Sequence, residues 1–304
     1  IVVDARVLGL AVLVTILAGV VLGWIAAAYL VRVRLADALQ GGGKATAGVR
    51  QHRLRNLLIT GQVALSLVLL VGAGLLATSY YRLERTSPGF NPEGVLTAGL
   101  SVASGQGFDV QGEGGRWVSL LSAFVERAAA LPGVQSVGGV RALPLTGAVE
   151  YFSFLIEGRP QPPPGEEPSA EYAVVAGEYF EAMQIPLRRG RVFTAGDREG
   201  APLVIVINEA LARRYWPGES AVGKRVRMGF SERVPREVIG VVGDVRQTAL
   251  EGETSPAVYL PIGQVPYPFL SIVARTSGEP MQLAGALRRE LRAVEPTRAL
   301  ANVR

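Results

Sequence analysis

Two long apolar runs without a charged residue dominate the first part of the chain. One extends from Val7 to Val31 and the other from Leu57 to Tyr81. A helix rises about 1.5 Å per residue, so each run is long enough to cross a hydrocarbon core of about 30 Å. Neither run has the polar face that a helix at the surface of a globular protein shows. The pattern predicts two transmembrane helices, at residues 1–31 and 57–81.

The second run carries small and polar residues that suit contact with another helix. Gly72 and Gly74 allow two helices to approach closely in lipid. An unpaired amide in hydrocarbon costs free energy, so we expect Gln62 to face a helix rather than lipid. These three residues are the candidate helix-packing positions.

After residue 82 the apolar positions alternate between strand and helix spacing. Proline and glycine separate the segments, and the proline-rich stretch 159–168 reads as a loop, which leaves open a division into two lobes. The pattern predicts an α+β or α/β domain over residues 82–304. Strands are expected at 95–102, 134–140, 152–156, 172–176, 203–207, 222–228, 237–245, 257–260 and 269–275, and helices at 112–131, 178–183, 209–215 and 281–294.

Composition agrees with a membrane protein, since 49% of residues are hydrophobic and 19% are charged. Such a chain has too much apolar surface for overall disorder. Its first residue is Ile1, so we expect a piece of a longer protein.

The net charge of +5 is concentrated between the two apolar runs. Basic loops stay on the cytoplasmic side of a membrane, and each base adds roughly 1 kcal/mol of attraction to anionic lipid. Residues 32–56 are therefore predicted to form a cytoplasmic loop against membrane lipid, with 82–304 on the opposite side. A nucleic-acid site would need bases spread over a folded face among aromatics, so we expect no nucleic-acid partner. The charged residues of the stretch are Arg32, Arg34, Lys44, Arg50, Arg53 and Arg55, against Asp37.

Residues able to perform catalysis or hold a cofactor are scarce. The chain has no cysteine, which excludes thiolate nucleophiles and disulfides, and its one histidine, His52, lies in the predicted basic loop. Gly43 and Lys44 lack the remaining residues of a phosphate-binding loop. Ser220 and Lys224 are four apart rather than the three of a Ser-x-x-Lys pair. We name no catalytic residue, and expect no cofactor and no metal.

Several polar residues have structural explanations instead. Asn208 stands where it would cap a helix, and Asp244 follows an apolar run, as a turn or cap residue does. A buried functional carboxylate is the other interpretation of Asp244. Trp216 with the Pro-Gly that follows is expected to be a packed turn. Three acid pairs lie in turn-rich stretches and are expected on a solvated surface: Asp197 and Glu199, Glu166 and Glu167, and Glu251 and Glu253.

The order of short motifs along the chain resembles the MacB/FtsX superfamily of ABC transporter permeases. It is most similar to the duplicated permeases called acidobacterial-type duplicated orphan permeases. The segments that carry the resemblance are 53–76, Ser87 to Pro92, Leu131 to Val134, Ile156 to Pro160, Ile185 to Leu187, Arg189 to Arg191, Val206 to Glu209, Ala212 to Gly218, Val222 to Arg225, 238–245 and Val258 to Pro261.

The resemblance implies a register. Residues 1–31 correspond to the last helix of a first repeat, 57–81 to the first helix of a second repeat, and 82–304 to its periplasmic core domain. The implied fold is a MacB-like α+β periplasmic domain preceded by two transmembrane helices in a bacterial inner membrane. Positions implied in topology and cytoplasmic coupling are Arg32, Arg34, Leu35, Asp37, Leu39, Arg53 and Arg55.

The family also implies partners and a function. An ABC ATPase on a separate cytoplasmic subunit would drive the permease, which would pair with its other repeat or a homodimer mate. Periplasmic adaptor or cell-wall proteins are further implied partners. Export through a MacB-like mechanism is one expectation. A non-transporting regulator or scaffold like FtsX and a membrane-tethered enzyme are the alternatives.

Overall fold

A computed structural model describes residues 13, 15–17, 19–20, 23–24, 46–101, 108–163, 165–229, 234–248 and 253–304. The chain divides into two compact units, Ile1–Thr78 and Ser79–Arg304. The predicted first membrane helix, 1–31, lies for the most part outside the described residues. Most of the predicted basic loop lies outside them too.

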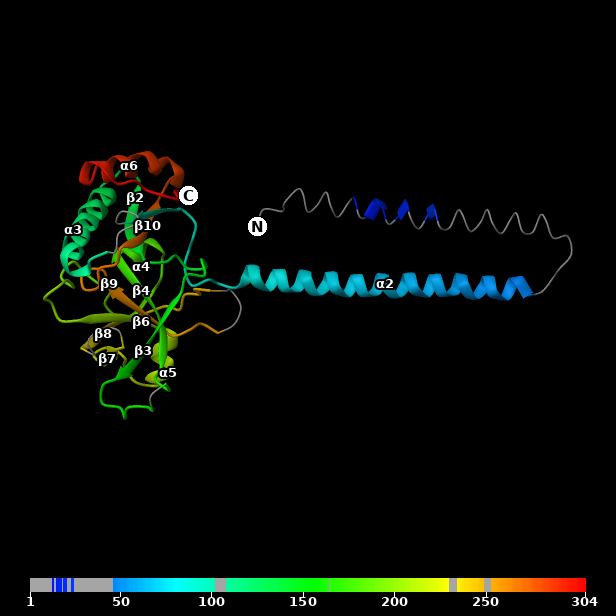
Figure 1. Cartoon of the computed structure of the whole chain (residues 1–304), viewed down its shortest axis with the longest axis horizontal. Coiled ribbons are helices and arrows are strands. Elements are labelled where there is room, and N and C mark those ends of the chain that lie inside the picture. Colours follow the sequence, from blue (N-terminus) through cyan, green and yellow to red (C-terminus); the bar gives the residue numbers. More distant parts are fainter. Residues whose placement is uncertain are drawn as a thin grey trace. The chain divides into compact units, whose positions relative to one another are not determined.

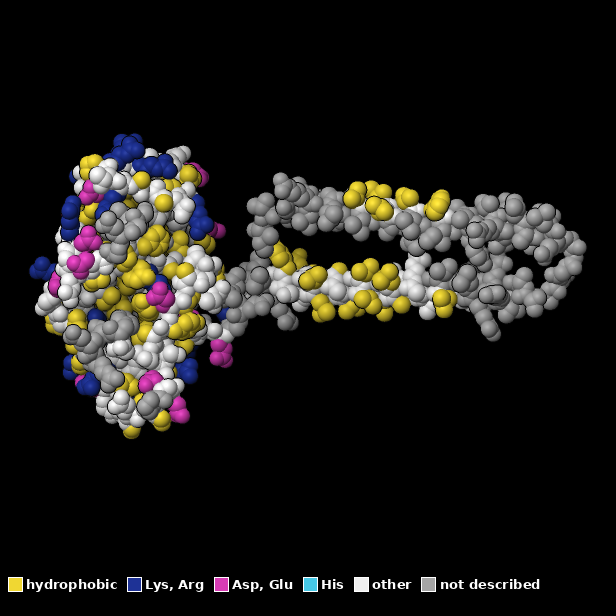
Figure 2. Space-filling model, in the orientation of Figure 1, with side chains coloured by type: hydrophobic (Ala, Val, Ile, Leu, Met, Phe, Trp, Pro, Cys, Tyr) yellow, Lys and Arg dark blue, Asp and Glu magenta, His cyan; other side chains and the backbone are white. Residues whose placement is uncertain are grey.

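Helix α2, Thr46–Arg85, contains the second apolar run (Figure 1). Its stretch Ile59–Tyr81 has a mean hydropathy of 2.1 and is long and apolar enough to cross a membrane. Figure 2 shows hydrophobic side chains exposed along it. Within the described residues this is one such helix, and not the two that the sequence predicts. The difference arises because only scattered residues of 7–31 are described. Since α2 begins at Thr46, the end of the predicted loop 32–56 is helical.

The unit Ser79–Arg304 is an α+β domain. Its strands are β1 Val95–Ser101, β2 Val134–Val140, β3 Glu150–Ile156, β4 Ser169–Gly177, β5 Leu187–Gly190, β6 Val204–Asn208, β7 Arg225–Met228, β8 Pro235–Val242, β9 Ala257–Pro261 and β10 Phe269–Thr276. Its helices are α3 Val110–Ala129, α4 Tyr179–Ala182, α5 Glu209–Tyr215 and α6 Leu283–Val294, the last preceded by a 3-10 turn at Pro280–Gln282.

The strands form one continuous sheet in the order β1-β10-β2-β4-β3-β7-β8-β6-β9. Strand β9 also pairs with β4, so the part from β4 to β9 closes into a ring. Strands β2 and β10 are neighbours in the sheet, although residues 141–268 separate them in sequence. The ring is therefore an insertion between two paired strands, and β1, β10 and β2 form the part into which it is inserted.

Alternate residues of the strands supply two apolar clusters. Ile205 and Ile207 belong to the cluster that includes residues of α3, α5 and α6. Val204 and Val206 belong to the cluster that includes α4. Because successive strand residues point to opposite faces, the two clusters lie on opposite faces of the strands. In Figure 1, α3 and α6 lie together beside β2 and β10.

Most predicted strands and helices of this domain are present, with ends shifted by a few residues. The short strand β5 was not predicted, since its four exposed residues show no apolar alternation. The division of this domain into two lobes stays a prediction. The proline-rich loop 159–168 only connects β3 to β4, and these two strands pair with each other.

Candidate functional site

The segment 87–94, called here the joint, follows α2 and is bonded to the domain at several points. Gly89 has φ +85°, and a Cβ built on it would lie 1.9 Å from the backbone oxygen of Asp244. Only glycine fits such a close backbone approach at a positive φ. The backbone oxygen of Pro88 accepts a hydrogen bond of 2.9 Å from the Arg246 amide. The first part of the joint is thereby fixed to the segment that follows β8.

Asn91 fixes the next part of the joint to the end of α4. Its amide donates to the backbone oxygen of Met183 at 2.9 Å. Its side-chain Nδ2 donates to Gln184 Oε1 at 2.9 Å, and its Oδ1 accepts from the Glu93 amide at 3.0 Å. The last bond is the side-chain-to-backbone turn for which asparagine is well suited. Phe90 packs against the apolar cluster of α4.

Arg275 of β10 connects three parts of the domain and is 6% exposed. Its Nε donates to the backbone oxygen of Ala182 at 2.7 Å. Its Nη1 and Nη2 donate to the backbone oxygens of Glu93, at 2.7 Å, and Asn91, at 2.6 Å. Burial lowers the pKa of Arg275, but a guanidinium stays charged in proteins. The buried cation therefore holds the joint and the end of α4 to β10.

The segment 298–304 is bonded to β1, the strand next to β10, which carries Arg275. Ala301 forms a bridge with Gly99 of β1, and the Thr97 and Arg304 backbones exchange hydrogen bonds of 2.8 and 3.0 Å. Arg298 Nη1 donates to the Ser101 backbone oxygen at 2.6 Å. Strand β1 pairs with β10 along its length. This one strand pair thus holds both the joint and the C-terminal segment.

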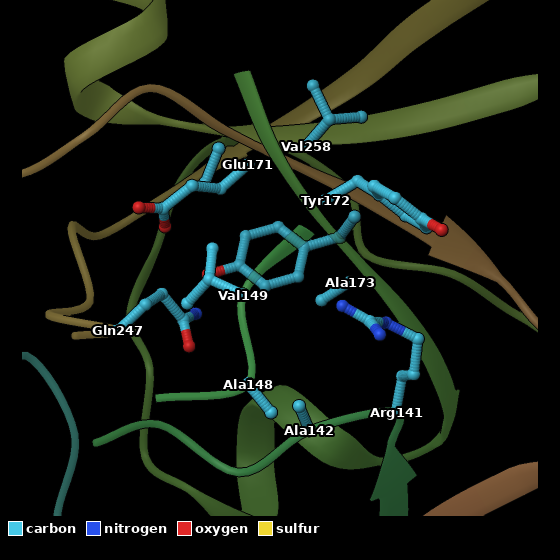
Figure 3. Close-up of a pocket in the computed structure, with 11 residues that line it drawn as sticks. Arg141, Ala142, Ala148, Val149, Glu171, Tyr172, Ala173, Gln247 and Val258 are labelled. Atoms are coloured by element: carbon cyan, nitrogen blue, oxygen red, sulfur yellow. The ribbon is translucent and has the colours of Figure 1, made fainter. Parts of the chain in front are cut away.

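A small pocket beside β4 is a second candidate site (Figure 3). Its cavity volume is about 10 Å³, which is room for about one water molecule. Figure 3 shows the Arg141 guanidinium and the Glu171 carboxylate on opposite sides of it. Arg141 pairs instead with Glu150 at 2.8 Å and lies 5.1 Å from the centre of the Tyr172 ring.

Tyr172 completes that cluster, since its hydroxyl donates to the Glu150 carboxylate. Burial, together with the nearby carboxylate, raises the pKa of Tyr172 to about 12. The Arg141 guanidinium also lies 5.3 Å from the centre of the Tyr267 ring. These groups contact one another around a space too small for a substrate, so we interpret them as a packed polar cluster. In the described ranges, no group of three or more acids or histidines could hold a metal ion.

The structure places few of the sequence-predicted site residues. Arg32, Arg34, Leu35, Asp37 and Leu39 lie outside the described residues. Arg53 and Arg55 lie within α2. Gln62, Gly72 and Gly74 also lie on α2, where Gln62 and Gly74 are exposed and Gly72 is half-buried. Their contacts with another helix stay a prediction.

The structure confirms the structural roles that the sequence predicts for Asn208, Asp244 and Trp216, whereas the prediction for Asp197 is wrong. Asn208 caps α5, as predicted, by accepting from the Leu211 amide at 3.0 Å. Asp244 is a cap residue too, but for α5 rather than for its own strand, since it accepts from the Ala210 amide at 2.7 Å. Trp216 is packed, with 4% exposure.

Asp197 is the exception, because it is 8% exposed and not on a solvated surface. It pairs with both terminal nitrogens of Arg191, at 2.7 and 2.9 Å. Glu199 and Glu166 are exposed, as predicted, and Glu167 is half-buried. Glu253 is exposed, whereas Glu251 lies outside the described residues.

Sequence reasoning did not identify Arg275. The signal was a charged residue at the end of an otherwise apolar strand, which requires a partner if it is buried. The joint's residues were noticed only as a motif, because their function depends on partners distant in the sequence.

Comparison with known proteins shows which family this chain belongs to. Residues 58–292 match the family described as MacB-like periplasmic core domain. The chain belongs to this family. The match begins within α2 and ends within α6, so the joint, the sheet and the ring all lie inside the MacB-like core domain. The domain described here is therefore a periplasmic domain with one candidate membrane-spanning helix before it.

A sequence relative and two solved structures accompany the family match. An uncharacterized ABC transporter permease, YvrN of Bacillus subtilis (strain 168), is 29% identical over 126 residues, which cover 38% of this chain and 30% of that protein. The chain thus matches less than a third of its relative's length.

The periplasmic region of MacB from Actinobacillus actinomycetemcomitans is 16% identical, with a TM-score of 0.44, over 73% of this chain and 94% of that one. The extracellular domain of the noncanonic ABC-type transporter YknZ from Gram-positive bacteria is also 16% identical, with a TM-score of 0.42, over 68% and 100%.

Proposed function

We propose that this chain is part of the permease subunit of a MacB/FtsX-type ABC transporter. A separate ABC ATPase in the cytoplasm supplies the motion, α2 carries it across a bacterial inner membrane, and the periplasmic domain uses it for export. Residues 32–56 face the cytoplasm, where Arg32, Arg34, Arg53 and Arg55 keep the loop on that side. The second permease repeat, or a second copy of the protein, completes the membrane part.

The observation that supports this proposal is the bonding of the joint. A flexible tether would allow α2 to move without moving the domain. Here Gly89, Asn91 and Arg275 attach the residues after α2 to the segment that follows β8, to the end of α4 and to β10. Displacement of the end of the helix therefore acts on these three parts of the domain. Such an attachment is expected of a domain that moves together with its membrane helix, and not of one that is only tethered to the membrane.

The first experiment isolates the full-length parent protein from its native membrane and identifies the proteins that travel with it. Recovery of an ABC ATPase supports the proposal. Recovery of cell-wall or envelope proteins without an ATPase contradicts it and favours an FtsX-like regulator or scaffold. Uptake of candidate substrates into inverted vesicles on addition of ATP then distinguishes export from regulation.

A second experiment tests the role of the joint in the recovered complex. Hydrogen exchange of β1 and β10 is measured with and without ATP, for the wild type and for Arg275→Met. We expect an ATP-dependent change in the wild type that is lost in the variant, while ATP hydrolysis continues. The matched control is Arg127→Met, since Arg127 forms a surface ion pair with Glu290. An equal ATP-dependent change in all three proteins would mean that the joint does not transmit motion.

A further inference from the structure

The edge strand β5 contains an irregularity that turns two arginines toward one pocket. Strand β5 pairs with β8, and the register shifts between Leu187 and Arg189. Side chains of successive strand residues normally point to opposite faces, whereas a bulge redirects one of them. Arg188 and Arg189 accordingly both line the same pocket.

That pocket has a cavity volume of about 410 Å³, within the range of sites for small organic ligands. Helix α5 and the turn after it also line the pocket and contribute a third arginine, Arg213. The apolar part of the lining is Ala212, Trp216, Ala221 and Val241. Trp216 is held in place by the core and is 4% exposed, so the apolar wall is preformed.

The charges around the pocket leave one arginine without a partner. Arg188 pairs with Glu209 at 3.3 Å, and Arg213 pairs with Asp244 at 2.6 Å. The remaining acid of the lining, Glu219, pairs with Lys224 at 2.9 Å. Within the described residues the Arg189 side chain forms neither an ion pair nor a hydrogen bond. Its guanidinium is therefore available to an anionic ligand.

Protection of an exposed edge is the other explanation for charges and a bulge on a short strand. It accounts for Arg188 and Arg189 on β5. It does not account for the presence of Arg213 of α5 and of Trp216 in the lining of the same pocket. The convergence of charged and apolar groups from two elements is typical of a ligand site.

We propose that this pocket binds a small carboxylate with an apolar, preferably aromatic, body. The carboxylate would take two parallel hydrogen bonds from the Arg189 guanidinium, whose planar fork fits that group. The body would lie against Trp216 and Val241, while Arg188 and Arg213 stay paired with Glu209 and Asp244. This binding does not depend on the proposed transport function.

The test measures binding of two probes to the full chain in lipid nanodiscs by isothermal titration calorimetry. The probes are 2-naphthoate and its uncharged counterpart 2-naphthamide, and empty nanodiscs provide the baseline. We expect saturable binding of 2-naphthoate, and at least about tenfold weaker binding of 2-naphthamide, because a hydrogen bond to a charged group is lost. The variant Arg189→Gln should weaken 2-naphthoate binding by a similar factor.

The matched control is Arg292→Gln, which removes an exposed arginine of α6 outside the pocket. It should leave 2-naphthoate binding unchanged. Among the described residues the Arg189 side chain has no hydrogen bond or ion pair to lose, so its variant is expected to fold, which circular dichroism checks. The proposal is overturned if 2-naphthoate does not bind saturably, if both probes bind equally, or if the two variants behave alike.

Discussion

The Arg275 guanidinium donates a hydrogen bond of 2.6 Å to the backbone oxygen of Asn91, although 184 positions separate the two residues. Asn91 lies in the joint just after α2, and Arg275 lies near the end of β10, Phe269–Thr276. The contact joins the beginning of the periplasmic domain to a strand from near its C-terminal end. Because the acceptors of this buried cation are carbonyl oxygens, the link does not depend on the protonation of an acid.

Replacement of Arg275 by methionine should destabilise the domain strongly. The change leaves the backbone oxygens of Ala182, Asn91 and Glu93 without their donor. Unpaired buried acceptors cost about 1–3 kcal/mol each before relaxation, so we expect a loss of roughly 3 kcal/mol in the free energy of unfolding. Denaturant titration of the full chain in nanodiscs measures it.

Hydrogen exchange separates this local role from general damage. In Arg275→Met the Asn91 amide, which donates to Met183, should exchange faster than in the wild type. Arg127→Met is the control, because its ion pair is half-exposed and worth at most about 1 kcal/mol. Equal losses of stability in the two variants would contradict the assignment of Arg275 as the anchor.

Gly89→Ala should be far more harmful than the same change at another glycine of similar conformation. Gly89 and Gly158 have φ values of +85° and +82°. The added methyl at Gly89 would collide with the Asp244 backbone oxygen, whereas at Gly158 nothing lies within 4 Å. We expect Gly158→Ala to cost about 1 kcal/mol from backbone strain alone and Gly89→Ala at least about 1–3 kcal/mol more. Thermal unfolding of both variants makes the comparison, and equal melting temperatures would mean that the joint shifts freely.

Local features of the fold could be predicted from the sequence because their causes are local. The spacing of apolar residues gave helix α5 with its correct ends, and it gave β2 likewise. Asn208 was recognisable as a cap because its partner, the Leu211 amide, is three positions away. The strand β5 was missed because an exposed, bulged edge strand leaves no periodic signal.

Pairings between side chains and between strands could not be predicted in the same way. Asp197 and Arg191 are only six positions apart, but their turn-rich stretch has no periodic spacing that shows the two side chains pair, so a buried acid was predicted on a solvated surface. The ring of strands depends on β4 pairing with β9, whose sequences alone do not specify one another. The role of Arg275 as an anchor likewise depends on its hydrogen bonds to Ala182 and to the joint, which are distant from it in the sequence.

Asn208→Ala should cost more than the loss of an ordinary helix cap. Asn208 is fully buried, and its Oδ1 accepts from the Ala257 amide at 2.9 Å as well as from Leu211. Its Nδ2 donates to the Ser255 backbone oxygen at 2.9 Å. We expect a loss of about 2–4 kcal/mol in the free energy of unfolding. Asp109→Ala, at the exposed cap of α3, is the control and should cost about 1 kcal/mol. Similar losses for both would mean that only the cap of α5 contributes.

The last prediction concerns pH. The Arg191 guanidinium, together with hydrogen bonds from Thr194, lowers the pKa of Asp197 in the folded state. A carboxyl with a lowered folded pKa stabilises the protein above its unfolded value of about 4, and this contribution is lost as the pH falls through the folded pKa. Asp197→Asn should therefore lower the free energy of unfolding by about 1–2 kcal/mol at pH 7, a modest figure because Arg191 is half-exposed. The difference from the wild type should shrink below about pH 4.

Glu219→Gln is the control, since that acid also has a lowered pKa from its pair with Lys224, but solvent screens the exposed pair and leaves little effect on stability. Denaturant titrations between pH 7 and pH 3 measure both, and a difference for Asp197→Asn that does not change over that range would show that its ion pair with Arg191 contributes nothing to folding.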